Sequence, residues 1–444
     1  MLLVRLWTIS VLLEPLLYFV LVDRTQIGFG GNISRLLQLL VMILIIANFM
    51  SGKRFRIPVY ARSLYFPLLL FIFYVFITSL VGFLLGAYSG GQTSGEQKGL
   101  TLVFHNDTTR PVVELIILIF QFFYFVILPV VFLRTKREFD FFFKWALFLL
   151  SVHFIGGWID FILTPLGVDV ISRHLGDGRS VGLRFHGIAG EPRDAAIYMM
   201  SLFFFIATYC FYKNGSIPSP KKSYTALIGV SCLATISASF FVAVFFSLLL
   251  WLAYEIRRVS VGFAFKATML VMVLALILGY SLSYFERLGL YVETYRDYLE
   301  SLYENPYQEL PFLIKVSFNN VYPIIRVLRE FSDGNIFPLF FGHGLGSSGI
   351  ANSLIYGEYN NPNNQLARLI YEQGVVGVWL FVYVFLRITK RCAVGLSGVE
   401  KNRLVIAGLI MIAGVFAHRT GVWMIWLGLL IAVAAYRIRS NPTT

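Results

Sequence analysis

Apolar runs of membrane-spanning length recur along the whole of this 444-residue sequence, and they constrain its fold more than any other feature. Hydrophobic residues make up 57% of the chain and charged residues only 14%, whereas about a quarter of a typical soluble domain is charged. In a bilayer every backbone polar group needs a partner within the protein, so helices of about 20 residues are the natural spanning element. The sequence therefore predicts an all-α polytopic membrane protein, with residues 1–444 forming a single integral membrane domain.

The apolar runs predict about twelve transmembrane helices. They lie near residues 2–22, 35–50, 64–88, 112–133, 140–165, 194–212, 223–237, 239–256, 262–283, 366–388, 404–418 and 421–437. The first run is not a cleavable signal peptide, because it has no small-residue cleavage site and another span follows directly. The three cysteines, Cys210, Cys232 and Cys392, do not suggest a disulfide framework.

Basic residues cluster in the loops that follow even-numbered predicted spans. These loops read "SGKRFR", "RTKR", "KNGSIPSPKK", "EIRR", "RITKR" and "YRIRS". Because Lys and Arg collect in cytoplasmic loops, both termini are expected in the cytoplasm. The net charge of +13 is then explained by topology and the lipid bilayer rather than by a nucleic-acid partner.

Two large loops, 166–193 and 284–365, are predicted to be extracytoplasmic, yet they also carry basic residues. These are Arg173, Arg179, Arg184, Arg193, Arg287, Arg296, Lys315, Arg326 and Arg329. These basic side chains either bind an anionic ligand outside the cytoplasm or pair with neighbouring Asp and Glu residues. Pairing is favoured for the mixed-charge, aromatic segment 286–309, whose pattern suits an amphipathic helix at the membrane surface.

A binding role is favoured for the stretch "GRSVGLRFHGIAGEPRDAA", residues 178–196. Arginine offers a planar fork of donors that matches two phosphate oxygens at once. Pro192 lets a helix begin after Glu191, which places Arg193 in its first turn, where free N–H groups favour an anion. The stretch suits a lipid-linked pyrophosphate. His186 is either a base or an ordinary polar contact.

A second candidate site runs from residue 340 to residue 377. The glycine-rich "GHGLGSSG" lacks the preceding strand of a dinucleotide-binding loop and is expected to form a flexible turn. A helix is expected to start near Pro362 and to continue into the tenth span. Arg368 and Glu372 are four residues apart and share a face of that helix, so they form either a simple ion pair or the wall of a polar cavity.

These stretches resemble motifs of the bacterial O-antigen polymerase and ligase superfamily. "RFHGIAGEP" is similar to the R-x-x-G motif of its first large periplasmic loop. "PLFFGHGLGS" resembles the superfamily's G-x-G signature, and "PNNQLARLIYEQGVVG" resembles its H-N-x-x-L…E-x-G-x-x-G signature. The resemblance implies a GT-C-like fold in the bacterial inner membrane. It also implies glycosyl transfer from undecaprenyl-pyrophosphate-linked oligosaccharides without a metal or another cofactor.

The sequence departs from the superfamily at two positions. Asn363 stands where the family signature has histidine, and Asn is not a base at neutral pH. Ligases tend to carry a Ser-Arg motif where this chain has Ser237 and Ala238. Both departures favour a polymerase of lipid-linked repeat units over a ligase that transfers glycan to lipid A-core. A flippase or transporter of lipid-linked oligosaccharides remains the alternative outside the enzymes.

The resemblance implies that arginines stabilise the leaving pyrophosphate. We assign this catalytic role to Arg184 and Arg193, and the role of base to Glu191, with His343 as its substitute. The remaining substrate-binding candidates are Arg179, His186, Asn363, Asn364, Arg368, Glu372, Arg326 and Arg329. A membrane protein that regulates chain length is a possible partner of such an enzyme.

Overall fold

The computed structural model describes residues 2–13, 33–52, 57–87, 109–168, 185–187, 192–217, 222–235, 312–356, 365–417 and 422–440, with isolated positions 244, 247, 293, 296 and 297. For residues 192–194, 222, 224, 225, 312–321, 352–356, 414–417 and 422, it describes the backbone only. Helices account for most of these residues, and no strand occurs among them. The predicted all-α class is confirmed.

Seven helical segments of the described chain are long and apolar enough to cross a membrane. They are α3 (Ile33–Met50), α4 (Val59–Leu84), Arg110–Phe132, α8 (Lys136–Leu163) with its 3-10 extension η3 (Thr164–Leu166), most of α9 (Pro192–Asn214), α17 (Gln365–Cys392) and most of α19 (Val422–Ser440). The length and composition of these helices therefore support the conclusion that the protein is embedded in a membrane.

Other helices account for several of the remaining predicted spans. α1 (Leu2–Leu13), α10 (Lys222–Ala234) and α18 (Gly398–Ala417) occupy three of them. The predicted loop 284–365 contains α14 (Phe312–Ser332), α15 (Phe337–Phe341) and α16 (Ser347–Tyr356). The predicted spans 239–256 and 262–283 lie outside the described residues apart from two isolated positions, so the count of twelve stays a prediction.

Local sequence explains where helices begin. α8 follows a capping box, in which the backbone N–H of Thr135 donates to the Glu138 carboxylate at 2.8 Å. α9 begins at Pro192, as the sequence predicted, because proline lacks the N–H that a first helical turn leaves unused.

The segment Arg110–Phe132 is one continuous helix with an irregular middle. It consists of α6 (Arg110–Gln121), the π-helical η2 (Phe122–Ile127) and α7 (Leu128–Phe132). Pro129 cannot donate a backbone hydrogen bond, so carbonyls one turn earlier become available to other groups. The Trp7 indole accordingly donates to the Tyr124 carbonyl at 3.3 Å. The backbone of Gly428 lies so close to Phe125 that a Cβ there would be 2.0 Å from the Phe125 carbonyl oxygen.

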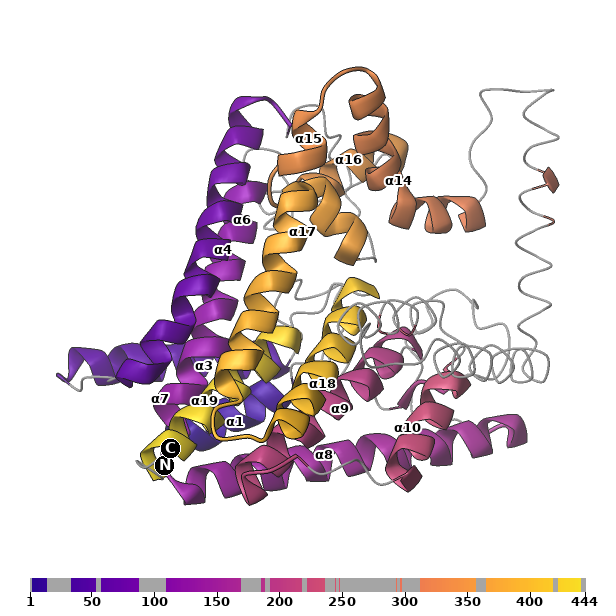
Figure 1. Ribbon diagram of the computed structural model, residues 1–444. Helices are drawn as coiled ribbons and strands as arrows, with labels where there is room; N and C mark the ends of the chain where they lie inside the picture. The colour runs from indigo at the N-terminus through magenta and orange to yellow at the C-terminus, as the bar shows by residue number, and fades with distance from the viewer. Residues whose placement is uncertain are drawn as a thin grey trace.

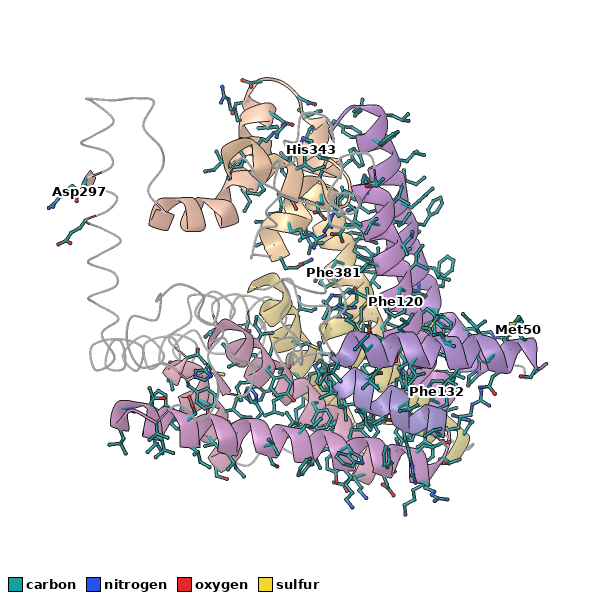
Figure 2. All side chains as sticks on the ribbon, turned by 180° about the vertical axis from the view of Figure 1, so that it is seen from behind. Met50, Phe120, Phe132, Asp297, His343 and Phe381 are labelled. Carbon is teal, nitrogen blue, oxygen red and sulfur yellow. The ribbon has the colours of Figure 1, made fainter. Side chains whose placement is uncertain are left out.

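The helices α4, α6 and α17 run side by side, and α8 lies across one end of this group (Figure 1). At that end the Tyr60 hydroxyl donates to the Arg391 carbonyl at 2.9 Å, joining the start of α4 to the end of α17. α14, α15 and α16 lie at the opposite end of α17 (Figure 1). Phe120, Phe132 and Phe381 lie among the packed helices, whereas Met50 ends the exposed tip of α3 (Figure 2).

Candidate functional site

A kink in α17 is joined to the turn between α15 and α16, and this junction supports one wall of a cavity. The kink lies at Gly374, whose φ is 66°. The backbone N–H of His343 donates to the Tyr371 carbonyl at 2.8 Å, and the N–H of Gly344 donates to the Glu372 carbonyl at 2.8 Å. The two segments that resemble family signatures are therefore in direct contact, through their backbones.

Glycine allows this contact because the three backbones are too close for side chains. A Cβ on Gly374 would be 2.2 Å from the Phe340 carbonyl oxygen, and one on Gly342 would be 2.4 Å from the Gln373 nitrogen. On α4, a Cβ on Gly82 would be 2.0 Å from the His343 carbonyl oxygen. The glycine-rich segment is thus a buried, hydrogen-bonded turn, and the expectation of a flexible turn was wrong about its packing.

Four charged side chains from two helices form a network beneath this turn. Arg368 of α17 donates from Nε to both carboxylate oxygens of Glu372, at 3.0 and 3.1 Å. The same guanidinium contacts Glu114 of α6 at 3.2 Å, and Glu114 also pairs with Arg110. The Ser348 hydroxyl donates to Glu372 at 2.6 Å. The predicted pair Arg368–Glu372 therefore belongs to a larger, buried network of two arginines and two carboxylates.

This network borders an open cavity with an empty volume of about 730 Å³. Its lining includes Glu114, Gln121, Gln365, Arg368, Glu372, Gln373, Phe71, Val75, Phe381, Trp423 and Met424. Polar side chains of α6 and α17 and apolar side chains of α4, α17 and α19 therefore line one space.

Two amide groups in the cavity wall each have a buried polar atom without a hydrogen-bond partner among the described residues, the oxygen of Gln365 and the nitrogen of Gln373. The amide oxygen of Gln373 accepts from the Thr78 hydroxyl at 2.8 Å. Its amide nitrogen has no hydrogen-bond partner among the described residues, although Gln373 is only 1% exposed. A buried donor without a partner costs about 1–3 kcal/mol, so this nitrogen is suited to bind an oxygen atom that enters the cavity.

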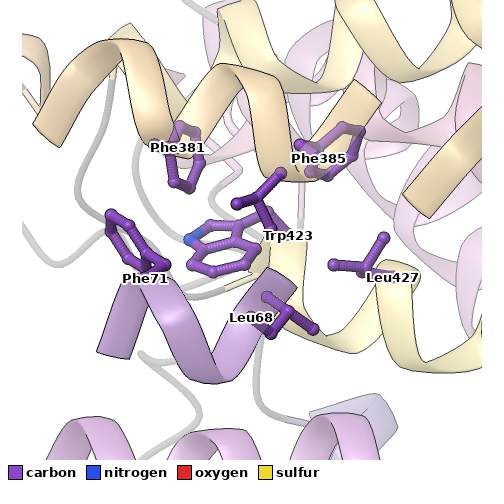
Figure 3. A pocket seen from close by; sticks show the side chains of 7 residues that line it. Leu68, Phe71, Phe381, Phe385, Trp423 and Leu427 are labelled. Carbon is purple, nitrogen blue, oxygen red and sulfur yellow. The ribbon is translucent and has the colours of Figure 1, made fainter. Parts of the chain in front are cut away.

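Aromatic rings form part of the apolar lining of the cavity. Phe71, Phe381 and Trp423 line both this cavity and a small adjoining pocket, and Figure 3 shows the Trp423 indole next to Phe71 and Phe381. The Phe381 and Trp423 rings meet edge to face, with centroids 4.9 Å apart. The cavity lining thus combines hydrogen-bonding and charged groups with apolar and aromatic side chains.

His343 lies at the edge of this site in a cluster with α14. Its Nε2 is 2.8 Å from the Glu330 carboxylate, its Nδ1 is 3.3 Å from the Tyr371 carbonyl, and its ring stacks on Tyr371. Arg326 also pairs with Glu330, at 3.2 Å. Burial alone would raise the pKa of Glu330, but the hydrogen bond and charge of His343, together with Arg326, lower it below its usual value.

A second buried cluster, the histidine anchor, consists of His153, Asp160, Phe185, His186 and Gly187. His186 Nε2 is 2.9 Å from an oxygen of the Asp160 carboxylate, and both side chains are buried. The N–H of Phe185 donates to the carbonyl at the end of α10 at 2.9 Å. A Cβ on Gly187 would be 2.3 Å from the His153 ring. This packing gives a physical reason for glycine in the segment that resembles the R-x-x-G motif.

The structure places the sequence-predicted residues in different surroundings. Arg368 and Glu372 line the cavity, His343 and Arg326 meet at its edge, and Arg329 is exposed on α14. His186 belongs to the histidine anchor, none of whose residues lines the cavity. For Arg193 only the backbone, in the first turn of α9, is described. The remaining candidates lie outside the described residues: Arg179, Arg184, Glu191, Asn363 and Asn364.

Two expectations concern His343 and metal ions. Both ring nitrogens of His343 face oxygen acceptors, the Tyr371 carbonyl and the Glu330 carboxylate, and its role as a substitute base stays a prediction. Among the described residues, no group of three or more His, Cys, Asp or Glu could hold a metal ion. The metal-independent reaction stays a prediction. 

Sequence reasoning missed Arg110, Glu114, Ser348, Gln373 and Asp160. A signal for the first two was available, because Arg110 and Glu114 are four residues apart at the start of an apolar run, the same arrangement as Arg368 and Glu372. The other three are ordinary polar residues in apolar helices, and only tertiary packing shows what they contact.

Comparisons with protein-family models, with curated proteins and with solved structures find no match for this chain. The likeness of its motifs to the O-antigen polymerase and ligase superfamily therefore stays a resemblance.

Proposed function

We propose that this chain is a membrane glycosyltransferase that polymerises lipid-linked polysaccharide repeat units. It transfers a glycan from undecaprenyl pyrophosphate to a repeat unit on the same carrier, at the periplasmic face of the bacterial inner membrane, without a metal ion. The observation that carries the proposal is the cavity in which Arg368, fixed by Glu114 and Glu372, lies close to the amide of Gln373.

The chemistry of the cavity suits this reaction. Negative charge develops on the pyrophosphate as it leaves the sugar, and preorganised cations in a site that excludes water stabilise such charge by a few kcal/mol. Arg368 is preorganised because two carboxylates on different helices hold its guanidinium. The unpartnered nitrogen of Gln373 can donate to a phosphate or sugar oxygen. The aromatic lining of the cavity suits a ligand that is partly apolar.

The contact between the two motif segments supports the same proposal. "PLFFGHGLGS" and "LIYEQGVVG" resemble signatures of one superfamily, and the backbone of the first packs on the kink within the second. Their glycines make this contact possible, and the network of Arg368 and Glu372 lies beside it. We also propose that both termini are cytoplasmic and that a chain-length regulator is the protein partner.

The test is to delete the gene in its host and to separate the surface glycan on a gel. Collapse of the ladder to core plus one repeat supports a polymerase. Naked core with accumulating lipid-linked polymer would instead identify a ligase, and loss of all periplasmic repeat units would identify a flippase.

Complementation of the deletion with Arg368→Lys tests the site itself. Lysine is a point charge and does not reproduce a planar fork that contacts two carboxylates. We expect polymer to fall by roughly 100-fold at normal protein level, as for loss of one preorganised donor. The matched control is Arg137→Lys, an exposed arginine in α8 that has no part in the proposed site, which should complement fully. Full activity of Arg368→Lys would exclude a specific guanidinium role.

A further inference from the structure

The proposed transfer needs a group that removes the proton from the attacking hydroxyl. Asn363 lacks that capacity, and both ring nitrogens of His343 already face oxygen acceptors. Two carboxylates of the described chain, Glu114 and Glu372, line the cavity. Glu191, which the sequence suggested as the base, lies outside the described residues. Among the described residues, the proton acceptor can therefore be sought between these two carboxylates.

The two carboxylates differ in what holds them. Glu372 is 2% exposed, and it accepts from Arg368 and from the uncharged hydroxyl of Ser348 at 2.6 Å. Its partners lie on its own helix and on α16, so it fixes the position of Arg368. Glu114 lies on a different helix, and the contacts of its carboxylate are with two guanidiniums, Arg110 and Arg368. Guanidinium donors are the groups for which a phosphate competes.

The inference that follows rests on the proposed function. Within that function, the difference between the two carboxylates gives Glu114 a specific role. We propose that Glu114 is the proton acceptor of the transfer, and that an incoming diphosphate activates it by taking over the guanidinium of Arg368. Before the substrate arrives, two cations stabilise the carboxylate of Glu114 and make it a weak base. Afterwards it keeps only Arg110 in a site of low dielectric, where a carboxylate binds a proton more strongly.

The reaction then balances within the cavity. The acceptor hydroxyl gives its proton to a carboxylate oxygen of Glu114 while its oxygen forms a bond to the anomeric carbon of the donor. The bond from that carbon to the phosphate oxygen breaks, and its electron pair leaves with the lipid diphosphate. Arg368 stabilises the charge of the diphosphate, and Glu114 later releases its proton to the leaving group or to water. No oxidant, reductant or metal takes part in these steps.

Glu114→Gln separates proton transfer from binding. Glutamine keeps the shape of the side chain and an oxygen for the arginines, but it does not accept the proton. We expect kcat for polymer formation to fall by roughly 10²–10⁴-fold, the usual effect of a lost general base. Binding of glycan-free undecaprenyl pyrophosphate in detergent should be unchanged or tighter, because a negative charge that competes for Arg368 is gone.

The matched control is Glu372→Gln, which removes the other carboxylate that contacts Arg368. As a positioning change, it should weaken binding of undecaprenyl pyrophosphate as well as turnover. A second measurement uses Glu114→Ala with added formate, which should restore part of kcat by supplying a small carboxylate in the vacated space.

Three results would each show that Glu114 is not the proton acceptor. If Glu114→Gln keeps kcat within about threefold of the parent, or loses binding together with turnover, or if formate restores nothing to Glu114→Ala, Glu114 is not the base. If the unmodified protein itself neither binds undecaprenyl pyrophosphate nor forms polymer, the proposed function fails, whatever Glu114 does.

Discussion

The cavity network and the histidine anchor are both buried clusters of ionisable side chains, but they differ in what surrounds them. In the cavity network, Arg368 contacts two carboxylates and Glu114 contacts two arginines, and open space lies beside them. In the anchor, Asp160 faces His186, and the aromatic rings of Trp158 and Phe185 pack around the cluster with centroids 5.2 Å apart.

This difference predicts different consequences of mutation. Removing one partner of an enclosed pair leaves the other charge without compensation, which is costly to folding. In the cavity network Glu114 and Arg368 each contact two oppositely charged side chains, so a substitution there should affect ligand binding and turnover more than stability. The anchor should therefore serve to hold the segment 185–187 in place, and the cavity should serve the chemistry.

The largest expected effect is on folding, from Asp160→Asn in the anchor. The substitution leaves His186 among apolar side chains without the Asp160 carboxylate. Breaking a buried pair in this way lowers the free energy of unfolding by about 3–5 kcal/mol. Thermal denaturation in detergent and the yield of folded protein measure the loss. Asp160→Asn combined with His186→Asn should recover part of it, because the uncompensated charge is then also removed.

The matched control is Asp140→Asn, which breaks a surface ion pair with Lys213 at 3.5 Å, both side chains being at least 40% exposed. The amide oxygen of the asparagine can still accept the hydrogen bond that Tyr212 donates to Asp140 at 2.9 Å. Exposed pairs of this kind are worth about 0–1 kcal/mol. Equal losses for Asp160→Asn and Asp140→Asn would contradict the view that the anchor is an enclosed, structural pair.

A somewhat smaller effect is expected for Gly374→Ala, which tests what stabilises the cavity region. An alanine at this position would have a φ of 66° and a Cβ against the Phe340 carbonyl. If the backbone contact with the α15–α16 turn holds this region in place, the substitution should lower the free energy of unfolding by about 1–3 kcal/mol or more. Gly229→Ala in α10 is the control, because nothing lies within 4 Å of a Cβ there, and it should be neutral or stabilising. Equal melting temperatures for the two variants would show that the kink is not essential.

Sequence predicted the parts of this protein that depend on local pattern. The apolar runs indicated helices, Pro192 indicated the start of α9, and the four-residue spacing indicated the pair Arg368–Glu372. It did not predict that Glu114 joins this pair, because that contact depends on how α6 and α17 pack.

Nor did the sequence predict how its glycine-rich segment folds. Short turns of glycine and serine are usually exposed, and the partner of this turn is a kink in another helix at Gly374. A periodic pattern reports which face of a helix is apolar, but it carries no information about which helix will cover that face. The long-range part of the site therefore needed a structure.

The smallest expected effect lies at the edge of the cavity, where Glu330 joins α14 to His343. The pKa of Glu330 is lower in the folded protein than its usual value of 4.5. The contact with His343 therefore stabilises the fold fully above pH 4.5, and this stabilisation is lost as the pH falls through the folded-state pKa. Because the Glu330 side chain is 23% exposed, we expect a contribution of about 1 kcal/mol at pH 7.

Glu330→Gln should therefore lower the melting temperature slightly at neutral pH, and its difference from the parent should shrink below about pH 4.5. Asp333→Asn, an exposed neighbour at the end of the same helix, serves as the control. A difference that persists unchanged in acid would mean that the carboxylate's charge is not what matters, since a protonated Glu330 resembles glutamine in shape. The stability of α14 would then come from its packing on Tyr371, and the edge of the cavity would resemble the enclosed anchor more than the charged network beside it.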